Sequence, residues 1–164
     1  MNRYLFFFII VLFIGCDKTE DNIFTQTPDE RLKATADEYR EALFSAPNGW
    51  FLAVDTKKDG AYRLWMSFEE NERVGMLSDM DATFSKAGET SVVPCISSWR
   101  LKALLAPSLI FDTYSYLHIL ADPQGANNGG SNSEGLISDF EFRIVDTDNG
   151  GINLIGNYNG RLAR

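Results

Sequence analysis

The spacing of hydrophobic residues changes once along the chain, from a helical period to a strand-like alternation. Between residues 27 and 49, four apolar side chains recur every three or four positions, and charged residues fill most positions between them. They are Leu32, Ala36, Tyr39 and Leu43. This spacing is typical of an amphipathic helix with one buried face. We therefore expect a helix in this part of the chain.

The signals for the start and the end of this helix are local. Thr27 is a good N-cap residue, Pro28 suits the first helical position, and Glu30 stands three residues after Thr27, where it completes a capping box. At Asn48-Gly49 the chain is expected to turn. The sequence thus predicts a helix that begins after Thr27 and stops at that turn.

From Trp50 onward, apolar and polar residues alternate, which is the pattern of strands. Short turns such as KKDG and DNGG favour antiparallel hairpins. The segments are WFLAVDT, AYRLWMSFEE, RVGMLSD, SWRLKALL, PSLIFDTY, SDFEFRIVD and INLIGNY, whereas SYLHILAD fits a strand or a helical turn. We predict an α+β fold, mainly β, with one N-terminal amphipathic helix packed on an antiparallel β-meander that forms an open sheet or partial barrel.

The N-terminus has the parts of a secretory signal. A basic Arg3 precedes about a dozen apolar residues, which are too few for a membrane-spanning helix because about 20 are needed. The end of this stretch, residues 13–16 (FIGC), resembles the bacterial lipobox, in which the cysteine is acylated after cleavage. We predict a signal peptide over residues 1–15 and a lipidated, palmitate-bearing Cys16, which would be the contact with the lipid bilayer.

The rest of the chain is predicted to be a short tether and one domain. Residues 16–26 are polar and read as the tether, and residues 27–164 are enough for a single domain with its own core. Asp17, Glu20 and Asp21 directly follow the lipidation position. In lipoproteins of Bacteroidota such an acid-rich start resembles an export signal to the outer face of the outer membrane, and a plain solvated tether would look the same.

The net charge of the chain excludes one class of partner. It is −8 at pH 7, and no cluster of Lys or Arg offsets it. Phosphate backbones are bound through basic patches, so we expect no nucleic-acid partner.

Several segments resemble one family of Bacteroidota lipoproteins that is catalogued as a domain of unknown function. They are SWRLKALLAPSLIFDTYSYLHILADP, EGLISDFEFRI and LIGNYNG, together with the helix start ERL and the turn NGW. Family members look like accessory lipoproteins encoded beside TonB-dependent transporters and their substrate-capturing lipoproteins. The resemblance implies a surface-exposed lipoprotein of the outer membrane that binds or scaffolds within a nutrient-uptake complex, and it supplies no catalytic residues.

The resemblance also implies a missing part, because family members continue beyond the position of Arg164. We therefore expect a C-terminally truncated member, with INLIGNYNGRLAR paired on one side only and with a tendency to self-associate.

Asp139 and Glu141 are the candidates for an enzymatic alternative. They alternate with Phe140 and Phe142, so on a strand both carboxylates would share one face at about 7 Å. Paired carboxylates at such a distance carry out glycoside hydrolysis, so a glycan- or peptide-acting hydrolase is one alternative. A sheet with one wet face shows the same pattern. A purely structural lipoprotein is the third possibility.

Trp65 and Arg63 are the candidates for ligand contact. The segment AYRLWMSF places Tyr62, Leu64, Met66 and Phe68 on one face, and therefore Trp65 on the other beside Arg63. An exposed tryptophan next to an arginine could stack on a sugar or peptide ring. The helix or a second sheet layer could equally cover this face.

The sequence predicts no metal site and no cofactor. His118 is the single histidine, and with Cys95 it falls short of the four ligands of a structural zinc site. The 146–151 segment DTDNGG resembles a calcium loop, but the twelfth position is Asn157 instead of glutamate. The Gly- and Asn-rich stretch 122–135 is the one long irregular segment, either a functional loop or a flexible one.

Overall fold

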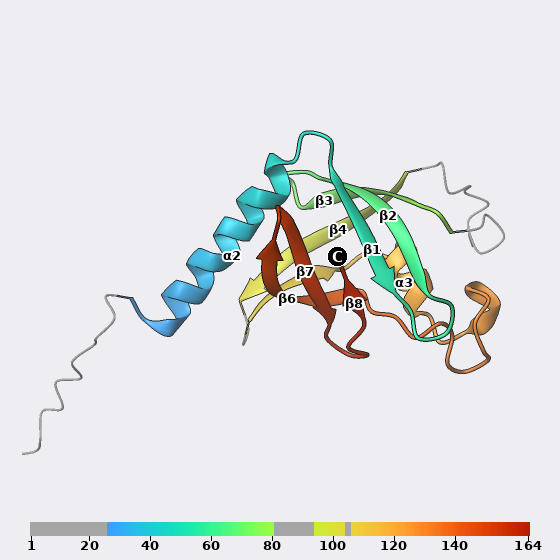
Figure 1. Cartoon of the computed structure of the whole chain (residues 1–164). Coiled ribbons are helices and arrows are strands. Elements are labelled where there is room, and N and C mark those ends of the chain that lie inside the picture. The colour runs from blue at the N-terminus through green and yellow to red at the C-terminus, as the bar shows by residue number, and fades with distance from the viewer. Residues whose placement is uncertain (1–25, 81–93, 104–105) are drawn as a thin grey trace, which may run out of the picture.

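The protein is a closed antiparallel barrel with one long helix against its side (Figure 1). This computed structural model describes residues 26–80, 94–103 and 106–164, so the predicted signal peptide, Cys16 and nearly all of the predicted tether lie outside the described residues. Each strand pairs with the next one along the chain, and β8 pairs with β1. The strands are β1 Trp50–Asp55, β2 Ala61–Phe68, β3 Arg73–Ser78, β4 Cys95–Ala103, β5 Pro107–Phe111, β6 Glu141–Asp148, β7 Gly151–Gly156 and β8 Leu162–Ala163.

The predicted open sheet or partial barrel is therefore wrong. Alternation and turn residues identified β1 to β7 but not the two-residue β8, and they carry no information on whether the first and last strands meet. They meet through the two-residue strand β8. Its Ala163 pairs with Val54 of β1 on one side and with Leu154 of β7 on the other. The expectation that INLIGNYNGRLAR is paired on one side only is wrong for the same reason.

Helix α2, Pro28–Ser45, begins as predicted. The Thr27 side chain accepts a hydrogen bond from the Glu30 backbone N–H, and the Glu30 carboxylate accepts one from the Thr27 N–H at 2.8 Å, so the capping box is present. The helix ends three residues before Asn48, and Gly49 makes the turn with φ of 73°. Ala36 and Leu43 are buried, and α2 contacts β4, β5 and β2.

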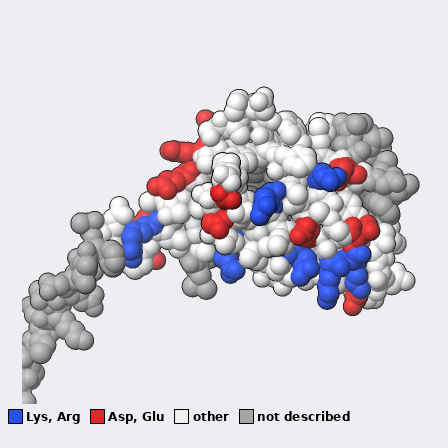
Figure 2. Space-filling view, in the orientation of Figure 1, with Lys and Arg blue, Asp and Glu red and all other residues white. Residues whose placement is uncertain are grey.

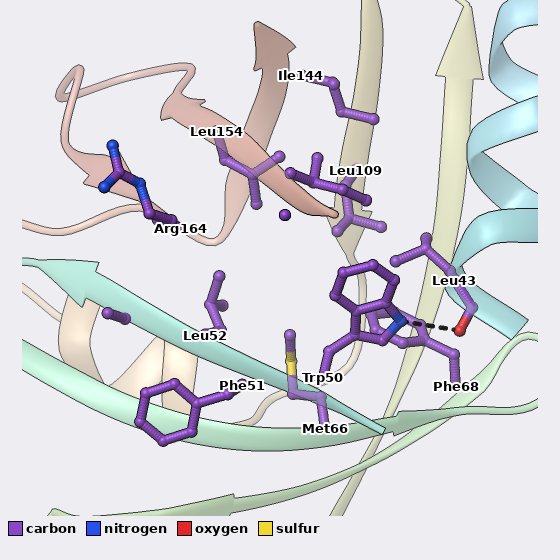
Figure 3. Close-up of a pocket in the computed structure, with 13 residues that line it drawn as sticks. Leu43, Trp50, Phe51, Leu52, Met66, Phe68, Leu109, Ile144, Leu154 and Arg164 are labelled. Atoms are coloured by element: carbon purple, nitrogen blue, oxygen red, sulfur yellow. Dashed lines mark hydrogen bonds between the residues drawn. The ribbon is translucent and has the colours of Figure 1, made fainter. Parts of the chain in front are cut away.

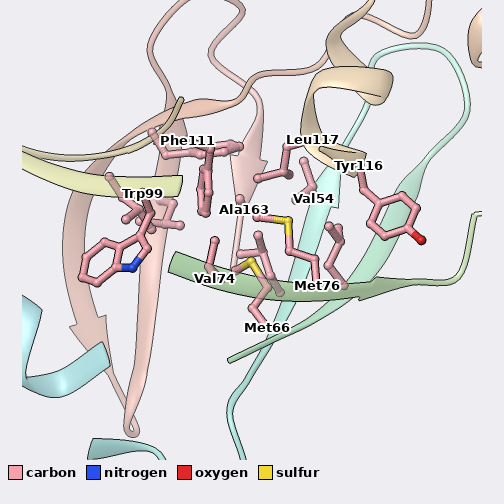
Figure 4. Close-up of a cluster of buried hydrophobic side chains, with 14 of the residues drawn as sticks. Val54, Met66, Val74, Met76, Trp99, Phe111, Tyr116, Leu117 and Ala163 are labelled. Atoms are coloured by element: carbon pink, nitrogen blue, oxygen red, sulfur yellow. The ribbon is translucent and has the colours of Figure 1, made fainter. Parts of the chain in front are cut away.

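Two ends of the barrel are closed differently. At one end helix α3, Tyr116–Ala121, directs Leu117 into the core (Figure 4). Leu117 and Leu120 of this helix are both fully buried. This helix resolves the ambiguity of SYLHILAD in favour of a helical turn. At the other end the barrel interior meets the C-terminal part of α2, where Trp99 of β4 packs edge-on against Phe44 at 5.6 Å. The core fills the middle of the barrel.

The long irregular stretch after α3 is ordered by one buried asparagine. Asn128 is 1% exposed, and its Nδ2 donates to the carbonyls of Ile119 and Asp122, both at 2.9 Å. Its Oδ1 accepts from the Gly130 N–H at 3.0 Å. A short 3-10 helix η3, Gly125–Asn127, lies within the stretch. These hydrogen bonds join the stretch to α3 and to Asp122.

Candidate functional site

The strongest candidate site is an apolar cavity inside the barrel, at the end that faces α2 (Figure 3). Its volume is about 330 Å³. The lining residues come from α2, β1, β2, β5, β6 and β7 and include Leu43, Trp50, Leu52, Met66, Phe68, Leu109, Ile144, Ile152 and Leu154. Ligand pockets in proteins begin at about 300 Å³ and are mostly apolar. The cavity is therefore large enough for a small ligand or for one large apolar side chain.

Strand alternation creates this lining. On β1, Leu52 and Val54 point inward and are buried, whereas Phe51, directly before Leu52, is 61% exposed. On β2, Met66 and Phe68 point inward, as the sequence predicted for that face. Eight strands enclose just enough space for side chains or for one small ligand. Here Leu117 and Leu120 of α3 are part of the buried core, and the cavity lies near Leu43 of α2.

Trp50 links the wall of the cavity to the end of α2. Its indole Nε1 donates to the carbonyl of Leu43 at 3.0 Å, so the ring is held between the helix end and the barrel (Figure 3). This bond satisfies one of the carbonyls that a helix C-terminus leaves free. The rest of the indole forms part of the apolar wall. Trp50 was not among the sequence candidates, although its position as the first inward residue after the NGW turn could have indicated it.

Trp65 and Arg63 lie outside this cavity. Trp65 is on the outer face of β2, 41% exposed, and its Nε1 donates to the Asn48 carbonyl at 2.7 Å. Arg63 forms an ion pair at 3.6 Å with Asp79, which directly follows the neighbouring strand β3. The indole also packs on Gly49, where a Cβ would lie 2.9 Å from a ring carbon. Trp65 thus anchors the turn after α2, and part of its face stays open to solvent.

Asp139 and Glu141 differ sharply in environment. Asp139 is 0% exposed, and it precedes β6 instead of lying in it. Its Oδ1 accepts from the N–H groups of Tyr158 at 3.0 Å and Asn159 at 2.9 Å. Glu141 is half-buried, and its backbone lies opposite that of Ile110 in the pairing of β6 with β5. The Asp139 carboxylate is therefore engaged in holding the turn between β7 and β8.

His118 lies in a row of aromatic rings. Its ring stacks on Phe140 with centroids 4.3 Å apart, and its Nδ1 is 3.1 Å from the Ser115 hydroxyl oxygen. Burial lowers the pKa of His118, while the Asp112 charge and a hydrogen bond with the Phe111 backbone oppose this shift. Among the residues that the structure describes, no group of three or more His, Cys, Asp or Glu side chains could hold a metal ion.

The surface shows no single charged patch on the face in Figure 2, where acidic and basic side chains lie among one another over the barrel. In the described part of the chain, no helix combines the length and apolar composition that crossing a bilayer requires.

The fold and the cavity define a class: a closed, eight-stranded antiparallel barrel with an apolar internal pocket and one flanking helix. The chain belongs to the family described as Domain of unknown function (DUF4302), whose sequence profile matches residues 20–164. No curated protein and no solved structure matches the chain. The domain-of-unknown-function part of the sequence resemblance is thereby confirmed.

Proposed function

We propose that this protein is a lipid-anchored binding module of the cell envelope that holds an apolar group in the barrel cavity. The observation that carries the proposal is the pocket of about 330 Å³ between Trp50, Leu109 and Leu154. A well-packed interior leaves few voids larger than a water molecule, so a pocket of this size is unusual for a core that serves stability alone. A lipoprotein with a purely structural role would not need such a pocket.

The setting we propose is an accessory role in an outer-membrane nutrient-uptake complex, anchored through Cys16 at the cell surface and working beside a TonB-dependent transporter. The proposed lipobox and the acidic residues that follow it support the location. An apolar binding site on such a tethered module would capture a nutrient or hold a partner subunit. The hydrolase alternative gains no support from the geometry, because the Asp139 carboxylate is buried and bonded to backbone N–H groups.

Binding of the apolar fluorophore N-phenyl-1-naphthylamine to the soluble domain, residues 26–164, tests the cavity. We expect saturable fluorescence enhancement and energy transfer from Trp50, whose ring lines the pocket. Leu109→Trp adds bulk inside the cavity and should abolish binding. Leu162→Trp, at a position that is 59% exposed on the outer face, is the matched control and should bind normally. Absence of saturable binding, or equal binding by both variants, would refute the proposal.

A further inference from the structure

The outer face of the barrel carries an uncharged, partly aromatic surface across β1 to β4. Two rows of outward-pointing residues cross neighbouring strands here. They are Phe51, Trp65 and Leu77 in the first row and Ser67, Gly75 and Ile96 in the second. We call these six residues the outer patch. Phe51 is 61%, Trp65 41% and Ile96 56% exposed. Contiguous exposed apolar residues on a folded domain mark interaction sites.

The indole of Trp65 is held in one orientation. Its Nε1 donates to the Asn48 carbonyl at 2.7 Å, and its ring lies so close to Gly49 that a Cβ there would be 2.9 Å from a ring carbon. Both contacts are with the turn that precedes β1, and the rest of the ring is open to solvent. A ring that is already fixed loses little conformational freedom when a ligand stacks on it.

Phe51 is the second exposed ring of the outer patch. Thr56 donates to Gly60 at 2.8 Å across the β1–β2 hairpin, so even-numbered residues of β1 bond to β2. Phe51 and Trp65 therefore form a non-hydrogen-bonded pair, the kind in which side chains lie closest. The Phe51 ring points away from the cavity (Figure 3). Two aromatic side chains thus stand next to each other on the outside of the barrel.

A hollow with one free hydroxyl lies beside the rings. Gly75 is in the middle of β3, and a Cβ on it would meet nothing within 4 Å. A glycine inside a strand often marks a place where a ligand approaches the backbone closely. Ser67 lies opposite Gly75, is half-buried, and in the described part of the chain its hydroxyl has no hydrogen-bond partner. The hollow therefore offers both space and a polar group.

The outer patch suits a sugar ring better than a peptide strand. Within the closed barrel, β2 and β3 each pair with a neighbour on both sides, so an added peptide finds no free sheet edge here. A pyranose ring has C–H groups on its faces, which stack on aromatic rings, and hydroxyl groups at its edge, which bond to a serine hydroxyl. Both kinds of group are present in the outer patch.

The charges around the outer patch favour a neutral ligand. The row next to Phe51 and Trp65 contains Arg63 and Asp79, which neutralise each other in an ion pair at 3.6 Å. No member of the outer patch is itself charged, and the chain as a whole carries −8. An anionic glycan would gain no ionic contact in the patch and would be repelled by the net charge.

We propose that the outer patch binds a neutral glycan chain, with one sugar ring stacked on Trp65, a neighbouring sugar against Phe51, and the chain passing over the hollow at Gly75, where it bonds to the Ser67 hydroxyl. This site is separate from the barrel cavity. It adds a second ligand class to the proposed function and does not depend on it.

Isothermal titration calorimetry tests the proposal on the full chain, purified in a detergent without a sugar headgroup. The probes are two neutral hexasaccharides of different shape, maltohexaose and cellohexaose. We expect saturable binding of at least one of them. Hexagalacturonic acid carries a charge on each sugar and should bind at least tenfold more weakly. Absence of saturable binding by both neutral probes, or equal binding of the acid, overturns the proposal.

Variants assign the binding to the outer patch. Trp65→Leu and Phe51→Leu keep apolar bulk but remove a ring, and each should weaken binding about tenfold, the upper range for one aromatic contact. Phe51→Tyr keeps the ring and should bind normally. Gly75→Val fills the hollow with a residue that favours strands and should also weaken binding. The control is Val145→Ala, which is 50% exposed on β6, four strands away from β2, and should have no effect.

Several results would contradict the proposal. Equal binding by Phe51→Leu and Phe51→Tyr would show that ring stacking plays no part. Should Trp65→Leu fail to fold, the two Phe51 variants and Gly75→Val decide alone. Sedimentation with phosphatidylglycerol vesicles that Phe51→Leu abolishes, without hexasaccharide binding, would assign the patch to a membrane surface. Binding of N-phenyl-1-naphthylamine in the cavity is measured separately on Trp65→Leu and should be unchanged, so either proposal can fail while the other stands.

Discussion

The carboxylate of Asp139 occupies the space that a side chain at Gly156 would need: a Cβ built on Gly156 would collide with Asp139 Oδ2. Gly156 is the last residue of β7, and Asp139 lies two residues before β6 begins at Glu141. Because Gly156 has no side chain, Asp139 can bury its carboxylate against the turn that leads to β8. This contact joins the closing strand to the rest of the barrel.

Gly156→Ala should therefore destabilise the protein by about 1–3 kcal/mol, the usual cost of overpacking a filled site. The reason is that Asp139 would have to move away from the N–H groups of Tyr158 and Asn159. Gly75→Ala is the matched control, because a Cβ there meets nothing within 4 Å, and it should leave stability almost unchanged. Urea unfolding followed by circular dichroism measures both. Equal midpoints would contradict the prediction.

Asn128→Ala should destabilise the protein by about 1–3 kcal/mol, because buried groups that lose a hydrogen-bond partner cost about that much. The carbonyls of Ile119 and Asp122 and the N–H of Gly130 would lose the asparagine side chain. Asn132→Ala, at an exposed position in the same stretch, should have no effect. Thermal melts compare the two variants. If Asn128→Ala melts like the unaltered protein, the stretch is held by other contacts.

The single histidine should titrate below its ordinary pKa of 6.5, because burial against Phe140 disfavours the charged imidazolium. A lowered pKa in the folded state means that the unfolded chain binds the proton more readily, so stability is unaffected above pH 6.5 and falls as the pH drops below it. Proton NMR follows this one imidazole, and the same chain in urea is the control. A folded-state pKa at or above 6.5 would show that the Asp112 charge outweighs burial.

Cys16→Ser should release the protein from the membrane, because the proposed acyl chains would have no attachment point. Cells grown with labelled palmitate should incorporate the label into the unaltered protein and lose it in the variant. Cys95→Ser serves as the control and should keep both the label and the membrane fraction. Label that persists in Cys16→Ser would contradict lipid anchoring at this residue. Protease treatment of intact cells would show whether the protein lies on the cell surface.

Local features of this protein could be predicted from the sequence because they depend on neighbouring residues. The capping box of Thr27 and Glu30 involves residues three apart, and both of its hydrogen bonds are present. The inward face of β2 follows from alternation within eight residues, and Leu64 and Met66 are buried accordingly. These are short-range consequences of backbone geometry, and no distant contact overrides them.

Barrel closure and the candidate site were decided by the tertiary structure, because they depend on residues far apart in sequence. Ala163 meets Val54 more than a hundred positions away, and β8 is too short for alternation to reveal it as a strand. Alternation predicts that Asp139 and Glu141 share one face of a strand, but it gives no sign that backbone N–H groups of the β7–β8 turn bind the Asp139 carboxylate. The cavity forms only where six elements converge, so no single segment of the sequence contains its signal.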